Sequence, residues 1–69
     1  MSMQRYFSKE TRAPLALLDT GDGYIPMIWD GQIRRTLINW VYETPEKAKA
    51  AADAKIRNFR RGMLQHLYA

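Results

Sequence analysis

Residues 24–42 read YIPMIWDGQIRRTLINWVY and contain the clearest local structural signal of the sequence. Its central Asp30-Gly31 pair stands between two apolar runs. Such a pair favours a two-residue type I′ turn, because the twist of that turn matches the twist of the flanking strands. The stretch therefore predicts a β-hairpin in which Ile28 lies opposite Ile33 and Trp29 lies opposite Gln32.

The two arms of this hairpin differ in character. The first arm, residues 24–29, contains Pro26, which has no backbone N–H to donate, so we expect this strand at a sheet edge or with Pro26 facing outward. The second arm runs from Gln32 to Tyr42 and is rich in β-branched and aromatic residues. Its alternation puts apolar side chains on both faces, so a single helix would leave one face to an N-terminal arm or a second subunit.

Three side chains share one face of the second arm, namely Ile38, Trp40 and Tyr42. Two interpretations of them stay open. Trp40 and Tyr42 pack beneath a helix, or the three together form a dimer seam.

The rest of the chain completes a single domain over residues 1–69. Residues 1–12 are an N-terminal arm or an edge strand, and residues 14–43 form an antiparallel β-meander with a turn at residues 19–23, where Gly and Asp tolerate positive φ. One amphipathic helix follows over residues 45–68. The predicted fold class is therefore α+β, with three or four strands and a C-terminal helix.

The helix has a clear start and a clear apolar stripe. Thr44 is a capping residue, Pro45 suits the first helical position, and Glu46 complements the helix dipole. Steps of three and four residues then define the side predicted to face the core. This stripe consists of Ala48, Ala52, Ile56, Phe59, Met63 and Leu67.

The net charge of +4 lies entirely in the helical segment, because residues 1–44 carry equal numbers of basic and acidic side chains. The helix face opposite the stripe carries three arginines around two apolar groups. Arginine and tyrosine are enriched at binding hot spots, so this face is a candidate partner surface. Its residues are Arg57, Arg60, Arg61, Leu64 and Tyr68. The competing interpretation is a solvated basic face.

Composition excludes several classes of protein. The chain has no Cys and one His, so disulfides and thiolate metal sites are absent, and no nucleophile has a base beside it in sequence. We expect no enzymatic activity, no metal and no cofactor. No long apolar run or secretory signal is present, so we expect a cytoplasmic protein without membrane insertion. A core this small favours a homodimer.

In length, lack of cysteine, single compact domain and expected dimer, the chain resembles the small accessory proteins of temperate phages. These include anti-CRISPR proteins and anti-activators of host quorum-sensing transcription factors. The resemblance rests on these general properties and not on a motif. It implies a non-enzymatic inhibitor in the host cytoplasm that binds a host regulatory protein, such as a transcription activator, and occludes a functional surface.

A small basic nucleic-acid-binding regulator is the alternative function. Arg34 and Arg35 add positive charge to the predicted sheet, and aromatic side chains offer stacking platforms for bases. The aromatic candidates are Trp29, Trp40 and Tyr42. The sequence contains no recognised nucleic-acid-binding motif, so the partner class stays open at this point.

Overall fold

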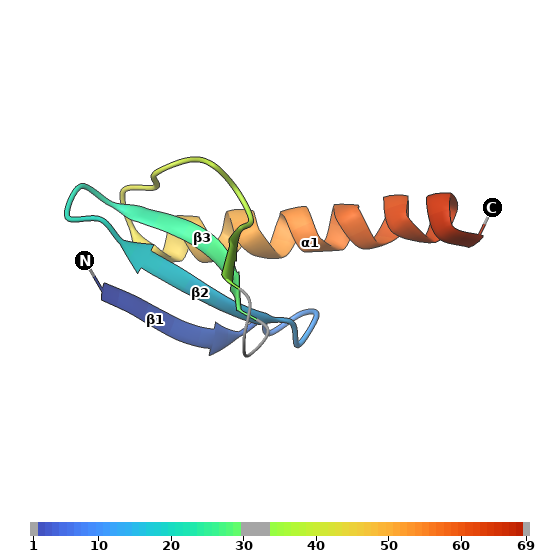
Figure 1. Ribbon diagram of the computed structural model, residues 1–69, viewed down its shortest axis with the longest axis horizontal. Coiled ribbons are helices and arrows are strands. Elements are labelled where there is room, and N and C mark those ends of the chain that lie inside the picture. Colours follow the sequence, from blue (N-terminus) through green and yellow to red (C-terminus); the bar gives the residue numbers. More distant parts are fainter. Residues whose placement is uncertain (1, 30–33, 69) are drawn as a thin grey trace.

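The computed structural model describes the backbone of residues 2–29 and 34–68, and the side chains of these residues as far as Asn58. The strands are β1 (Ser2–Phe7), β2 (Pro14–Asp19), β3 (Tyr24–Trp29) and β4 (Arg34–Thr36), and the helix α1 (Pro45–Tyr68) follows them. Within this part of the chain the strands form one antiparallel sheet in the order β1-β2-β3-β4, with α1 alongside it (Figure 1). The predicted α+β class is confirmed.

The turn between β2 and β3 follows from its residue types. Gly21 adopts a φ of 92°, which a residue without a Cβ reaches at little steric cost. The Asp19 carboxylate accepts a hydrogen bond from the Gly21 amide at 3.0 Å, and the Thr20 amide donates to the Gly23 carbonyl at 3.0 Å. These contacts fix the Asp19–Tyr24 pair at the end of the hairpin.

The predicted register of the β3–β4 hairpin is wrong. Ile28 pairs with Arg35 and Trp29 with Arg34, whereas the sequence predicted Ile33 and Gln32 as their partners. The Asp30-Gly31 turn itself lies outside the described residues. The observed register brings Leu37 beside Pro26 and against the core, where the predicted one would have placed the charged Arg35.

Pro26 explains why the last strand is short. The sequence predicted a strand as far as Tyr42, but β4 ends at Thr36. In an antiparallel strand the N–H and C=O of one residue point to the same neighbour. The Pro26 carbonyl accepts from the amide of Leu37 at 2.9 Å, but the ring nitrogen has no hydrogen to return, so the ladder stops there.

The expectation that the Pro26 strand lies at an edge or turns its proline outward is also wrong. β3 is an interior strand, and Pro26 is among the most buried side chains. The ring nitrogen of Pro26 faces the β4 side of the strand, where β4 has already ended, so no strand residue there needs an N–H from Pro26. The chain then loops back to form an isolated bridge between Tyr24 and Tyr42, with two backbone hydrogen bonds of 2.8 Å.

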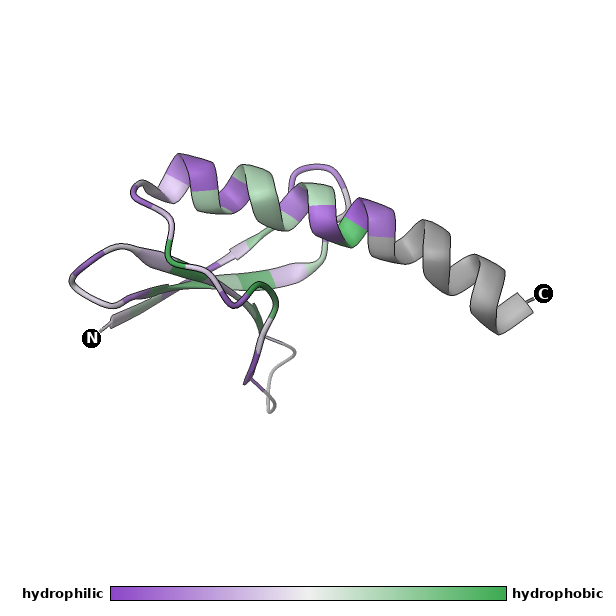
Figure 2. Cartoon of the chain, turned by 90° about the horizontal axis from the view of Figure 1, so that it is seen from above, coloured by the Kyte–Doolittle hydropathy of each residue, from purple (hydrophilic) through white to green (hydrophobic). Residues whose placement is uncertain are grey.

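The helix begins as predicted and packs over β2 and β3 on one face of the sheet (Figure 2). The Thr44 hydroxyl accepts from the Lys47 amide at 3.2 Å, which caps the first turn. The first three residues of the predicted stripe are buried, and the small side chains of Ala48 and Ala52 let the helix backbone approach the sheet. Besides Pro26, the buried apolar side chains of the described chain are Leu15, Ala16, Leu17, Ala48, Ala52 and Ile56.

The later stripe residues Phe59, Met63 and Leu67 lie beyond the described side chains. No helix among the described residues is long and apolar enough to cross a membrane.

Candidate functional site: the helix-free face of the sheet

The helix patch predicted as a partner surface is only partly described. Arg57 donates to a Glu10 carboxylate oxygen at 2.9 Å, and both side chains are about half exposed. This ion pair ties the loop between β1 and β2 to α1, and it directs the Arg57 guanidinium toward an acid of its own chain. Arg60, Arg61, Leu64 and Tyr68 lie beyond the described side chains, so their role stays a prediction.

The three residues of the predicted dimer seam do not share a strand face. Ile38, Trp40 and Tyr42 lie after the end of β4, in the segment that returns to the helix. Trp40 is 65% exposed, so packing beneath the helix is wrong for this residue, whereas Tyr42 pairs with Tyr24. These apolar residues therefore lie in an irregular segment and not at alternate positions of one strand.

The helix leaves one face of the sheet, the face turned away from α1, uncovered. Side chains alternate along each strand, and Leu15 and Ile28 pack against the helix, so their neighbours in sequence face the other way. We call this surface the open face. From the register its side chains are Met3, Arg5, Phe7, Pro14, Ala16, Leu18, Ile25, Met27, Trp29, Arg34 and Thr36. All of them are at least partly exposed except Ala16, which is buried beneath its neighbours.

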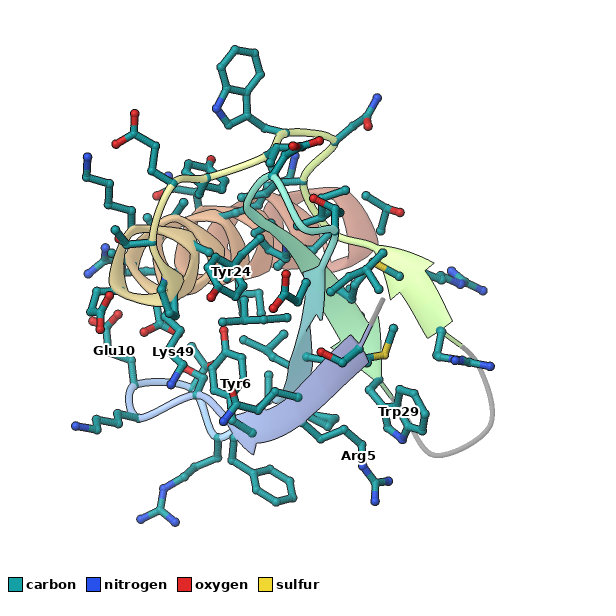
Figure 3. The ribbon with its side chains drawn as sticks, turned by 90° about the vertical axis from the view of Figure 1, so that its left-hand side faces the viewer. Arg5, Tyr6, Glu10, Tyr24, Trp29 and Lys49 are labelled. Carbon is teal, nitrogen blue, oxygen red and sulfur yellow. The ribbon has the colours of Figure 1, made fainter. Side chains whose placement is uncertain are left out.

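Two arginines converge on one tryptophan at the end of the open face. The guanidinium carbons of Arg5 and Arg34 lie 4.9 and 5.0 Å from the centre of the Trp29 ring. Arg34 is the direct cross-strand partner of Trp29, while Arg5 reaches over from β1. Figure 3 shows Arg5 and Trp29 on the opposite side of the sheet from α1, with Tyr6 pointing toward the helix.

This Arg–Trp cluster, defined as Arg5, Trp29 and Arg34, presents ordered positive charge. Cation–π contact engages the flat face of a guanidinium and leaves its N–H edges available for hydrogen bonds. No carboxylate of the described residues forms an ion pair with either arginine. Beside the cluster lies an open hollow of about 320 Å³, lined by Arg5, Tyr6, Phe7, Pro14, Leu15 and Trp29.

The opposite end of the open face is apolar. Met3, Leu18 and Ile25 form one cross-strand row, and each is partly exposed. Phe7, next to the Arg–Trp cluster, is 72% exposed. The face therefore combines a cationic end with an apolar end.

A polar cluster on the helix side of the sheet is structural. Ser8 is only 1% exposed, and its hydroxyl donates to the Asp53 carboxylate at 2.6 Å while accepting from the Thr11 amide at 3.1 Å. Both hydrogen-bonding roles of this hydroxyl are thus occupied, and the residue anchors its loop to α1. Tyr6 lies close by, with the Lys49 ammonium 4.9 Å from its ring centre.

Tyr6 makes stability sensitive to alkaline pH. Burial, with a smaller contribution from the negative charge of Asp53, raises the pKa of Tyr6 from the ordinary 10.0 to about 12. The unfolded chain therefore loses this proton at lower pH than the folded chain does. We expect the free energy of unfolding to fall between pH 10 and 12, measured by urea denaturation, and the fall to be smaller in Tyr6→Phe. Equal losses in both proteins would contradict this assignment.

Sequence reasoning identified part of the open face. It named Trp29 and Arg34 as candidates for nucleic-acid contact, but it omitted Arg5 and Phe7. The sequence does place Met3, Arg5 and Phe7 at alternate positions. Their side chains share one face only if residues 2–7 form a strand, and the sequence left that open.

No protein-family model, no curated protein and no solved structure matches this chain. The function of the open face is therefore argued from its own geometry.

Proposed function

We propose that the protein is a small non-enzymatic regulator that binds nucleic acid through the open face of its sheet. The observation that carries this proposal is the Arg–Trp cluster, in which two guanidinium groups are held on an uncovered surface that has no carboxylate among its described residues. Arg35 is exposed on β4 as well, but its pairing with Ile28 directs it to the other face of the sheet, so the open face offers two arginines, and the chain as a whole carries +4. Positive charge of this kind attracts a polyanion.

The geometry of the cluster favours duplex contacts over base stacking. The Trp29 ring already contacts two guanidinium groups, so it is less available to stack on a base. Both guanidinium carbons lie within about 10 Å of each other, since each contacts the same ring. Their N–H edges suit phosphate oxygens and the acceptor edge of guanine, and strands can enter the major groove.

A fluorescence-anisotropy titration against random-sequence duplex DNA tests the proposal. Two phosphate contacts would give a slope of about −1.8 in the plot of log affinity against log salt, or roughly a 12-fold loss between about 50 and 200 mM salt. The variant Arg5→Gln/Arg34→Gln is expected to weaken binding at least about tenfold and to reduce the slope by about two.

The matched control is Lys47→Gln/Lys55→Gln, which removes the same charge from exposed positions on α1. It should bind nearly as the unchanged protein does, because these lysines lie on the other side of the sheet. An equal loss in both variants would show that net charge and not the open face governs binding. Absence of binding at the lower salt concentration would overturn the proposal.

A protein-binding inhibitor is the second candidate, and the apolar side chains of the open face favour it. Met3, Leu18 and Ile25 form an apolar row at one end of the face, and the exposed Phe7 lies beside the arginines at the other end. Apolar and arginine side chains are commonly combined at protein interfaces. In this case the protein would occlude a functional surface of a larger regulatory partner. Binding of this kind should respond weakly to salt, and loss of function should follow substitution of Phe7 more than of Arg34.

A further inference from the structure

The backbone hydrogen bonds of β3 show which residues of each strand direct their N–H and C=O groups to which neighbouring strand. Tyr24 exchanges backbone hydrogen bonds with Tyr42, and Pro26 accepts from Leu37, so these residues point toward the β4 side. The intervening residues of β3 therefore point toward β2. In an antiparallel sheet this alternation continues from strand to strand.

The same alternation leaves one set of β1 groups directed out of the sheet. Gln4 pairs with Leu17, which pairs with Pro26 on its other side. Because Pro26 points away from β2, Leu17 exchanges its hydrogen bonds with Gln4. The N–H and C=O groups of Met3, Arg5 and Phe7 then face outward along the free edge of β1.

This edge lacks the usual protection. β1 is six residues long and contains no Pro or Lys, the residues that commonly block edge pairing. Phe7 lies on it and is 72% exposed. Among the residues whose side chains are described, the buried apolar groups are few and three of them are alanines, a core size at which small domains commonly associate.

We propose that a second copy of this chain pairs with β1 in antiparallel fashion, with Arg5 opposite Arg5 of the partner subunit. Phe7 then lies opposite Met3 of the partner subunit, so the exposed ring gains an apolar and sulfur-containing neighbour. All the outward backbone groups of Met3, Arg5 and Phe7 find partners in this register. A shift by one residue would place the two helices on opposite sides of the sheet.

The facing arginines do not prevent this pairing, because Trp29 draws the Arg5 guanidinium away from the edge and over the sheet. The two-fold axis stands perpendicular to the sheet, so the two sheets join into one and both helices lie on the same side. Both Arg–Trp clusters then lie on the other side, flanking the axis. The pairing itself does not depend on what the open face binds.

Amide hydrogen exchange measured by NMR tests the proposal within one strand. At micromolar protein the amides of Met3, Arg5 and Phe7 should exchange rapidly, and at near-millimolar protein they should become protected. The amides of Gln4 and Tyr6 bond to β2 and should be protected at both concentrations, so they serve as the internal control. Sedimentation equilibrium should show the mass rising toward twice that of the chain.

Two substitutions complete the test. Phe7→Lys should raise the dimer dissociation constant at least about tenfold while leaving the fold intact, since it adds charge at the edge and removes an exposed ring. Trp40→Ser removes a similarly exposed ring away from β1 and should leave the dimer unchanged. A chain that stays monomeric at near-millimolar concentration, or a dimer that persists in Phe7→Lys without concentration-dependent protection, would overturn the proposal.

Discussion

Leu15→Ala is expected to lower the free energy of unfolding by about 2–5 kcal/mol. Leu15 is 1% exposed and forms the core cluster with Ala52 and Ile56. Ala52 and Ile56 are part of α1, so their positions are fixed by the helix backbone and they cannot easily move to fill the cavity that the missing side chain leaves. A domain of this size has a stability near the lower end of about 5–15 kcal/mol, so the variant should keep only about 0–3 kcal/mol and unfold at a much lower urea concentration. Urea denaturation followed by circular dichroism measures the change.

The matched control for this substitution is Leu18→Ala on the same strand. Leu18 faces away from α1 and is only partly buried, so its truncation removes less apolar contact. We expect about half the effect of Leu15→Ala or less. If the two variants lost equal stability, the assignment of the core to the helix side of the sheet would be wrong.

Local patterns predicted the helix well because they are set within a few residues. The cap at Thr44 and the stripe through Ala48, Ala52 and Ile56 depend on side chains one turn apart, and all of them behave as expected. The fold class followed for the same reason: turn residues divide apolar runs into strands, and only one helix is available to cover them.

The register of the β3–β4 hairpin was not predictable from the turn alone. Asp-Gly favours a two-residue loop, but the core selects the pairing that brings Leu37 beside Pro26. Packing across the sheet outweighed the local turn preference. Likewise, β-propensity extended the last strand to Tyr42, whereas the missing donor at Pro26 ends it at Thr36.

The sequence predicted only part of the open face. Trp29 and Arg34 are neighbours through one hairpin, so sequence reasoning could bring them together. Arg5 joins them across two further strand pairings, and its position depends on whether the N-terminal segment is a strand. A site assembled from β1, β3 and β4 therefore requires the complete sheet order, which no local pattern supplies.

The sheet order also links the two uncovered surfaces of the molecule. Arg5 lies on the open face through its side chain and on the free edge of β1 through its backbone. Nucleic-acid binding would use the side chain and self-association would use the backbone, so the two activities can be separated by substitution. Arg5→Gln should weaken DNA binding without removing any edge hydrogen bond, whereas Phe7→Lys should weaken the dimer while keeping both arginines.

Gly23→Ala is expected to destabilise the protein by about 3 kcal/mol, the upper end of the range for overpacking. A Cβ at this position would overlap the carbonyl oxygen of Tyr42 and lie 2.6 Å from the Val41 Cγ1 atom. The carbonyl belongs to the bridge that brings the chain back to Tyr24 before the helix begins, so it can move only by breaking that bridge. Urea denaturation gives the loss of stability, and hydrogen exchange should show reduced protection at the amides of Tyr24 and Tyr42.

Gly21→Ala in the same turn separates this steric effect from a general intolerance of the turn. Gly21 has a φ of 92° and no atom within 4 Å of an added Cβ, so its substitution introduces backbone strain of about 1–2 kcal/mol without any clash. The Tyr24 and Tyr42 amides should keep their protection in this variant. Two results would contradict this assignment: a larger loss of stability in Gly21→Ala than in Gly23→Ala, or full hydrogen-exchange protection of the Tyr24 and Tyr42 amides in Gly23→Ala. Either result would show that the close contact between Gly23 and Tyr42 does not position the start of α1.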